Sequence, residues 1–175
     1  MATTRRLTTD DLYKFNLVNL DPFTVTFNMH FYFQYMSQWP DFQKVMLSPN
    51  GTIMGYMIGK AEGTGENWHG HVSAVTVAPE YRRLGLARKL MDFIEELSEK
   101  IFNCYFVDLF VRVTNTVAID MYKNFGYVVY KTVKEYYSGN EDAYDMRKAL
   151  GRDVQRKSMI PLPNPVHISD LKIPL

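Results

Sequence analysis

Residues 82–87, Arg-Arg-Leu-Gly-Leu-Ala, have the composition and the position of an anion-binding loop. They follow the apolar run 72–78 and lead into a predicted amphipathic helix over 85–100. A loop that enters a helix N-terminus offers free backbone N–H groups and the positive end of the helix dipole. Two arginines beside those groups add charge-assisted donors. The pattern therefore predicts a site for a ligand that carries a diphosphate.

A second polar junction follows the predicted strand over 105–113. This strand leads through Asn115 into a predicted helix over 116–125 that carries Tyr122. Asn115 could act only as the N-cap of that helix. Tyr122 could be a core residue, because it shares a helix face with Ile119. Spacing alone leaves these structural interpretations open beside a chemical one.

Two histidines, His69 and His71, lie on one face of a predicted strand. They could hold zinc, but Glu66 would be a strained third ligand and no other histidine or cysteine is near, so we expect no metal. His71 could serve as a weak general base, or it could be a hydrogen-bonded residue of the sheet.

The single cysteine, Cys104, precedes an apolar run, and we expect it to be buried rather than nucleophilic.

The order of the predicted elements indicates a mixed α/β sheet with antiparallel and parallel parts. Three strands between residues 42 and 77 are joined by short turns and should form an antiparallel meander. Gly126 should end its helix as a left-handed cap. The predicted strands cover residues 4–7, 42–47, 53–60, 68–77, 105–113, 127–133 and 143–150, and the predicted helices start at Thr9 and cover 31–38, 85–100 and 116–125.

Composition narrows the class of protein. The chain has 175 residues and a formal net charge of +1, which suits one domain and argues against direct binding to nucleic acid. No apolar run approaches the ~20 residues of a membrane-spanning helix, and no secretory signal is visible. We expect a cytoplasmic protein without a membrane contact. Residues 151–175 contain four prolines and no periodicity, so we expect an extended tail that is either disordered or docked on the surface.

Arg82-x-x-Gly85-x-Ala87, Asn115 and Tyr122 resemble the GNAT acetyltransferase superfamily, in order, over about residues 2–150. The resemblance implies the GNAT fold over 1–150, a mostly antiparallel, seven-stranded mixed sheet with about four helices. It also implies acetyl-CoA as co-substrate, with the loop on its pyrophosphate and the preceding strand along its pantetheine arm. Tyr122 and His71 become the candidate catalytic residues, since the family's tyrosine lies near the thioester and could protonate the leaving thiolate. The implied acetyl-CoA residues are Val75, Thr76, Val77, Arg82, Arg83, Leu84, Gly85, Leu86, Ala87, Asn115 and Tyr122.

Longer tracts are similar to the catalytic subunits of NatB-type N-terminal acetyltransferases. They include residues 19–22, 68–71, 136–137, 143–149 and 160–163. This resemblance implies acetylation of the α-amino group of nascent chains that begin Met-Asp, Met-Glu, Met-Asn or Met-Gln. It also implies a heterodimer with a large helical-repeat auxiliary subunit that reaches the ribosome. The candidate acceptor residues are Phe27, His71, Ser73, Phe110, Tyr136 and Tyr137.

Two other functions stay open. One is a GNAT enzyme that acts on lysine or a small amine, and the other is a non-catalytic acyl-CoA-binding subunit. The apolar residues Leu12, Phe15, Phe31 and Met36 could contact the auxiliary subunit, although we expect most of them to pack on the sheet.

One position departs from the NatB-type pattern. Members of that family often carry Leu-Thr-Glu where this chain has Phe23-Thr24-Val25. An α-amino group has a pKa of about 8, so part of it is neutral near pH 7 and a weak base suffices. Without the glutamate, that base would be His71 or a water molecule held by backbone groups.

Overall fold

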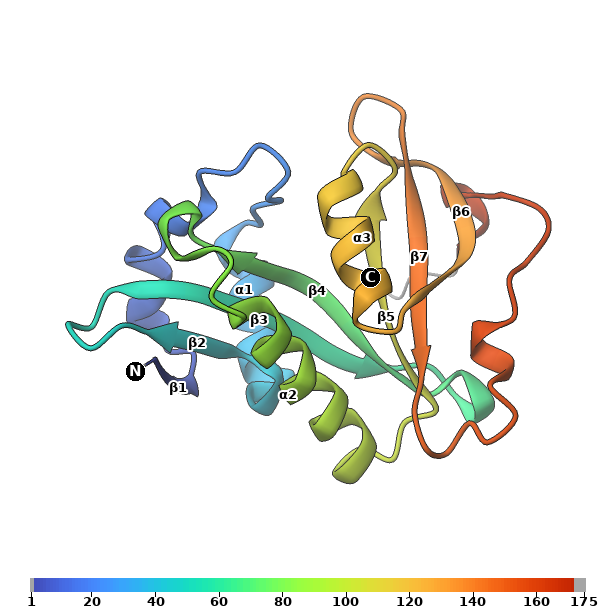
Figure 1. The fold of residues 1–175 in the computed structure, drawn as a ribbon, viewed down its shortest axis with the longest axis horizontal. Helices are drawn as coiled ribbons and strands as arrows, with labels where there is room; N and C mark the ends of the chain where they lie inside the picture. The colour runs from blue at the N-terminus through green and yellow to red at the C-terminus, as the bar shows by residue number, and fades with distance from the viewer. Residues whose placement is uncertain (1, 172–175) are drawn as a thin grey trace.

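A single mixed sheet of eight strands runs through residues 2–171, the part of the chain that this computed structural model describes (Figure 1). The strand order is β1-β2-β3-β4-β5-β7-β6-β8. Only the β4–β5 and β6–β8 pairs are parallel. The strands are β1 (Thr3–Arg6), β2 (Lys44–Leu47), β3 (Ile53–Glu62), β4 (His69–Val77), β5 (Phe106–Arg112), β6 (Val128–Tyr137), β7 (Glu141–Ala149) and β8 (Val166–His167).

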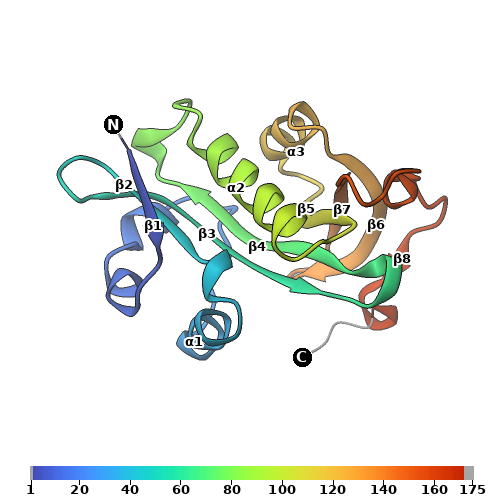
Figure 2. The ribbon, with the colours of Figure 1, turned by 90° about the horizontal axis from the view of Figure 1, so that it is seen from below.

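Helices cover both faces of the sheet. Figure 2 shows α2 (Leu86–Lys100) and α3 (Thr116–Asn124) on one face and α1 (Met29–Gln38) on the other. The α-helix expected from Thr9 onward was wrong. That segment forms two short 3-10 helices, Thr9–Tyr13 and Asn16–Asn19, and the Asp11 carboxylate accepts from the Thr8 N–H at the first of them. The described residues therefore contain three α-helices.

The core lies in two layers, one on each side of the sheet. Between the sheet and α2, residues such as Met57, Met91 and Ile94 are completely buried. On the α1 side, Leu12 and Phe15 are buried, and Phe31 and Met36 pack against that cluster. The expectation that most of these residues pack on the sheet is confirmed. Burial of about 25 cal/mol per Å² of apolar surface makes both layers stabilising.

The two halves of the sheet separate in its middle, and this separation positions the site. Strands β4 and β5 pair only from His69–Phe106 to Val72–Leu109. Beyond Val72, β4 continues to Val77 along β3, and β5 continues to Arg112 along β7, so the two strands diverge (Figure 1). The backbone N–H and C=O groups of residues 73–77 that face β5 therefore have no strand partner among residues 2–171.

The segment after β7 packs back against β6. The Leu162 N–H donates to the Tyr130 carbonyl at 2.7 Å, and Val133 of β6 pairs with Val166 of β8. Residues 172–175 of the predicted tail lie outside the described residues. No helix in the described part of the chain is long and apolar enough to span a membrane.

Candidate active site

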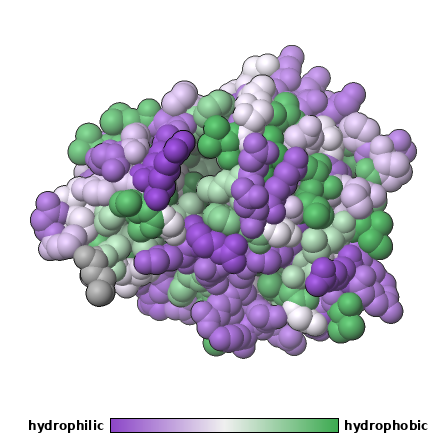
Figure 3. Space-filling model, in the orientation of Figure 1, coloured by the Kyte–Doolittle hydropathy of each residue, from purple (hydrophilic) through white to green (hydrophobic). Residues whose placement is uncertain are grey.

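A cavity of about 720 Å³ fills the wedge between the diverging strands. Figure 3 shows this face of the molecule hollowed, with hydrophobic atoms in the hollow and hydrophilic side chains around it. One wall is formed by residues 72–77 of β4, and the other by residues 109–112 of β5 together with α3. The loop before α2 and the segment 21–25 close the remaining sides.

The loop before α2 has the geometry of an anion site. Gly85 is the N-cap of α2 with φ +74°, a left-handed conformation in which glycine avoids steric cost. No side chain caps this helix end, and no acidic residue lies in its first turn. The first backbone N–H groups of α2 therefore remain free donors at the positive end of the helix dipole.

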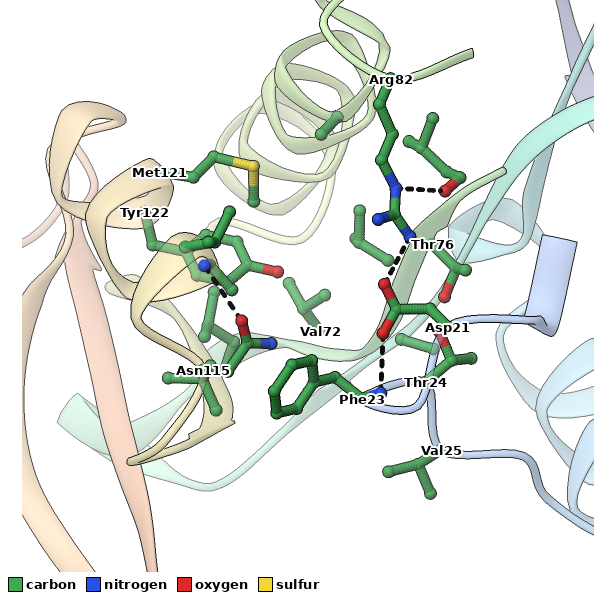
Figure 4. A pocket seen from close by; sticks show the side chains of 18 of the residues that line it. Asp21, Phe23, Thr24, Val25, Val72, Thr76, Arg82, Asn115, Met121 and Tyr122 are labelled. Atoms are coloured by element: carbon green, nitrogen blue, oxygen red, sulfur yellow. Dashed lines mark hydrogen bonds and ion pairs between the residues drawn. The ribbon is translucent and has the colours of Figure 1, made fainter. Parts of the chain in front are cut away.

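The two arginines of this loop differ in their surroundings. The Arg82 guanidinium pairs with Asp21, and its Nε donates to the Val77 carbonyl at 3.3 Å. Asp21 also accepts from the Phe23 N–H, so Arg82 ties the segment 21–25 to the end of β4 (Figure 4). Arg83 is exposed and lines the cavity.

Tyr122 and Asn115 enter the cavity from α3. The Asn115 Oδ1 accepts from the Ala118 N–H at 3.2 Å, so Asn115 is the N-cap and also lines the cavity. Tyr122 is only 7% exposed, and its hydroxyl points into the cavity (Figure 4). Burial, with a smaller contribution from Tyr137, raises the Tyr122 pKa, so its phenol stays protonated near neutral pH.

Aromatic residues form the end of the cavity near β5. Ser73, Phe110 and Tyr137 line it, and the Tyr137 hydroxyl donates to the Phe110 carbonyl at 3.2 Å. The Arg112 guanidinium lies 4.1 Å from the centroid of the Tyr137 ring. Burial raises the Tyr137 pKa to about 12, although Arg112 opposes this, so the hydroxyl keeps its proton. The end of the cavity is thus apolar with neutral hydroxyl groups.

Four of the predicted site residues do not line the cavity. The ring of His71 lies beside that of the lining residue Phe110, at 5.7 Å between centroids, and Tyr136 stacks on Phe110 at 4.6 Å. Phe27 stacks on Phe31 at 3.9 Å, beside α1. Leu84 is 59% exposed on the far side of the loop. The remaining predicted residues line the cavity together: Ser73, Val75, Thr76, Val77, Arg82, Arg83, Gly85, Leu86, Ala87, Phe110, Asn115, Tyr122 and Tyr137.

Sequence reasoning missed Asp108, which holds His71. The His71 Nδ1 lies 2.7 Å from the Asp108 Oδ1, and both residues are buried. Burial alone would lower the His71 pKa, but the Asp108 carboxylate more than offsets this, so the pKa is raised. The sequence did carry a signal for Asp108, because it is a charged residue inside the most apolar predicted strand. Burying a carboxylate is costly unless it has a partner.

A cluster of charges surrounds the two histidines. Ligand atoms of Glu62, His69 and His71 lie within 4.8 Å of one another, whereas Glu66 is exposed and pairs with Lys157. The Lys60 ammonium already lies 2.6 Å from Glu62. We therefore interpret this group as an ion-paired cluster.

Other residues of the cavity were also missed. Asp21 and Arg88 line it; Asp21 lies in the tract 19–22 but was not assigned to the site, and Arg88 belongs to none of the motifs. Cys104, in contrast, is buried as expected, and burial raises the pKa of its thiol to about 11. A thiol with this pKa is a poor nucleophile at neutral pH.

The model of the acetyltransferase (GNAT) family matches residues 12–127. The chain belongs to the GNAT acetyltransferase family. The GNAT fold expected from the sequence is confirmed, with an eighth strand in the sheet.

Relatives of this GNAT chain match along nearly its whole length. It is 62% identical over 170 residues to N-alpha-acetyltransferase 20 of Dictyostelium discoideum, covering 97% of this chain and 98% of that protein. It is 56% identical over 172 residues to the Arabidopsis thaliana N-terminal acetyltransferase B complex catalytic subunit NAA20, covering 98% and 99%.

Two solved structures share the arrangement. Chaetomium thermophilum Naa20 in complex with a bisubstrate analogue matches with a TM-score of 0.89 and 43% identity, over 95% of this chain and 97% of that one. A NatB acetyltransferase complex bound to CoA and MES matches with a TM-score of 0.78 and 43% identity, over 85% and 99%.

Proposed function

We propose that this GNAT enzyme is a NatB-type peptide α-N-acetyltransferase, with acetyl-CoA as its co-substrate. It acetylates chains that begin Met-Asp, Met-Glu, Met-Asn or Met-Gln. The observation that carries the proposal is the wedge between β4 and β5, which joins an anion-binding loop to an aromatic end. The similarity to NatB catalytic subunits along almost the whole chain supports the same acceptor.

The wedge fits acetyl-CoA through groups that have no partner within the described residues. The N-terminus of α2 and the exposed Arg83 would hold the pyrophosphate. The free edge of residues 73–77 would bond the amide groups of the pantetheine arm as an added strand does. Arg82, already paired with Asp21, would act by holding the segment 21–25 in place.

The reaction needs few charged groups. The neutral α-amine attacks the thioester carbonyl carbon, the C–S bond breaks, and the thiolate leaves. We assign Tyr122 as the donor of a proton to that thiolate, because burial keeps its phenol protonated and its hydroxyl points into the cavity. The attacking nitrogen gives up one proton, so the products are the acetylated peptide and CoA.

A carboxylate base is not part of this proposal. Asp21 is the one acidic residue among those that line the cavity, and it is bonded to Arg82 and the Phe23 N–H. Val25 supplies no carboxylate. The raised pKa of His71 favours its charged form, which suits binding of a substrate better than proton abstraction. We therefore assign the proton of the amine to water in the open cavity.

The acceptor would lie at the aromatic end. Ser73, Phe110 and Tyr137 line that end, with Tyr136 and His71 next to Phe110. The aromatic rings suit the side chain of the first methionine. We place Phe27 at the rim, where the segment 21–28 approaches α1.

The enzyme works in a complex with an auxiliary subunit, which we propose to be a large helical-repeat protein that brings it to ribosomes in the cytoplasm. The segment before and within α1 exposes large apolar side chains on that side of the molecule, and such a patch is typical of an interface. We propose residues 1–150 as the acetyltransferase domain and 151–175 as an appended tail. The exposed apolar residues of this patch are Tyr13, Leu17, Leu20, Met29 and Phe33.

The test compares three peptides. The first begins Met-Asp, the second begins Ser-Glu, and the third has an internal lysine as its only free amine. The enzyme and its partner subunit are incubated with acetyl-CoA, and thiol release is measured. We expect the Met-Asp peptide to react fastest, and the lysine peptide to release thiol at the background rate. Equal rates on all three would favour a general amine acetyltransferase, and no release would favour a non-catalytic acyl-CoA-binding subunit.

A further inference from the structure

A row of charged side chains crosses four strands behind the acceptor end of the cavity. Lys60 of β3 is opposite His71 of β4, His71 is opposite Asp108 of β5, and Asp108 is opposite Arg147 of β7. Directly opposite residues share one face of a sheet. Asp108 therefore lies between two groups that can carry positive charge, on the face to which Ser73 also belongs.

Asp108 is a carboxylate, and this fixes the proton on its neighbour. Its side chain is 4% exposed. Burial raises the pKa of Asp108, but the charges of His69, His71 and Arg147 lower this pKa by more, so it lies well below its usual range. An ionised carboxylate only accepts hydrogen bonds. At 2.7 Å, the His71 Nδ1 must therefore carry the hydrogen that it donates to the Asp108 Oδ1.

The other ring nitrogen of His71 remains available. Among residues 2–171, Nε2 has no hydrogen-bond partner, while Asp108 holds the opposite side of the ring. The ring lies beside Phe110 and two residues from Ser73 along β4, and both of these line the acceptor end of the cavity. A charged imidazole here would offer one N–H donor and a positive charge next to the acceptor.

We propose that Asp108 is the positioning residue that holds His71 as a charged donor, and that this pair selects acceptors with a carboxylate as their second side chain. The selection rests on the proposed function, because it needs a peptide α-amine in the cavity. Without Asp108, the His71 imidazole would be neutral more often, and a neutral imidazole would discriminate little between aspartate and asparagine. Asp108 therefore takes part in the choice of substrate.

The groups around His71 fix the direction of its pH dependence. Asp108 of β5 and Glu62 of β3 favour its charged form, and Lys60 of β3 opposes it. His69 of β4 lies 3.5 Å from the Asp108 carboxylate. On the remaining elements, burial raises the pKa of Tyr136, so its phenol stays neutral, and Arg147 faces Asp108. Selection for aspartate should be full below the raised pKa of His71 and decline as the pH rises through it.

The experiment uses the complete heterodimer and two peptides that differ only in Met-Asp or Met-Asn. The ratio of their kcat/KM values is measured from pH 5.5 to 9, for the unmodified enzyme and for Asp108→Asn. We expect the substitution to lower the ratio about tenfold near pH 6.5, chiefly through KM for the Met-Asp peptide. In the variant, the pH at which the ratio declines should move to lower values.

Asp145→Asn is the matched control. Asp145 is a buried carboxylate of β7 that bonds Arg147, but it does not contact His71. We expect it to lower the melting temperature as Asp108→Asn does and to leave the ratio unchanged. A ratio that falls equally in both variants would overturn the proposal.

A second pair of variants covers the case in which Asp108→Asn fails to fold. His71→Gln should remove the aspartate preference, and adding Asp108→Asn to it should change the ratio no further, since two amides can pair neutrally. A further fall in the double variant would overturn the proposal.

A titration of the His71 ring by NMR separates this proposal from the proposed function. We expect Asp108→Asn to lower the pKa of that ring without any substrate present. A changed titration with unchanged peptide selectivity would overturn the role in selection alone. If the unmodified heterodimer acetylates no α-amine, the proposed function fails and the selection role fails with it.

Discussion

At the scale of single residues, Tyr122 is the group on which the chemistry depends most. It is buried, its pKa is raised, and its hydroxyl points into the cavity (Figure 4). A protonated phenol next to a developing thiolate can donate its proton as the C–S bond breaks. Neither Asn115, which caps α3, nor the paired Arg82 offers a comparable proton.

Tyr122→Phe should therefore lower kcat about 100-fold and leave KM for acetyl-CoA nearly unchanged, because the ring keeps its packing. Steady-state kinetics on a Met-Asp peptide would measure this. Tyr127→Phe is the control, since the Tyr127 hydroxyl is also buried but bonds Glu95 outside the cavity. An equal loss of kcat in both variants would remove Tyr122 from the mechanism.

The sequence predicted the types of the site residues better than their orientations. Arg83, Gly85 and Tyr122 line the cavity as the motif indicated. Leu84 belongs to the same motif but is exposed and does not line the cavity; both of its neighbours, Arg83 and Gly85, have left-handed φ angles that the motif did not reveal. Asp108 was missed because its purpose depends on a partner 37 positions away in the chain.

At the scale of elements, strong local patterns were sufficient for most of the fold. The amphipathic helix α2 and the turns of the β2–β3–β4 meander were predicted within a few residues. The segment from Thr9 was misread because a 3-10 helix buries apolar residues at nearly the same spacing as an α-helix. Strand β8 has two residues, and its pairing with Val133 leaves no local signal.

The start of α2 gives a prediction about the donor side. Gly85→Ala forces a Cβ into a left-handed conformation and should cost about 1–2 kcal/mol of stability. Because the same turn shapes the anion site, KM for acetyl-CoA should also rise several-fold. Thermal unfolding and kinetics would measure the two effects.

Gly51→Ala is the matched control, since Gly51 has φ +84°, equally open surroundings and a place in the remote β2–β3 turn. It should lose similar stability without a change in KM for acetyl-CoA. If both variants raised that KM alike, the loop before α2 would have no special part in binding the donor.

The segment after β7 gives a prediction about the acceptor side. Strand β8 pairs with β6 next to the irregularity between Val133 and Tyr137, and His167 bonds Glu135 at 2.9 Å. These contacts hold the turn of chain that positions Tyr136 and Tyr137. Ending the chain after Gly151 should therefore lower the melting temperature and raise KM for the peptide more than KM for acetyl-CoA.

Val154→Ser, at a side chain that is 86% exposed in the same segment, is the control and should change neither KM. Kinetics of the shortened chain with its partner subunit would decide. An equal rise of both KM values would show that the segment stabilises the fold without positioning the acceptor groove.

At the scale of the whole molecule, the divergence of β4 and β5 determines where the two ends of the site meet. It opens the sheet so that one cavity is lined by the loop before α2, by α3 and by the segment 21–25. No local pattern predicts this opening, because both strands continue as regular strands with other partners. The sequence indicated the two ends of the site, and the sheet topology joins them.

One continuous cavity should hold both substrates, and the binding of a bisubstrate conjugate tests this most directly. Calorimetry would compare CoA alone with CoA joined through an acetyl bridge to the α-nitrogen of a Met-Asp peptide, or to a lysine Nζ of a matched peptide. We expect the α-linked conjugate to bind at least about 100-fold more tightly than CoA, and the lysine-linked conjugate to bind about as tightly as CoA. An α-linked conjugate that binds no more tightly than CoA would contradict this expectation.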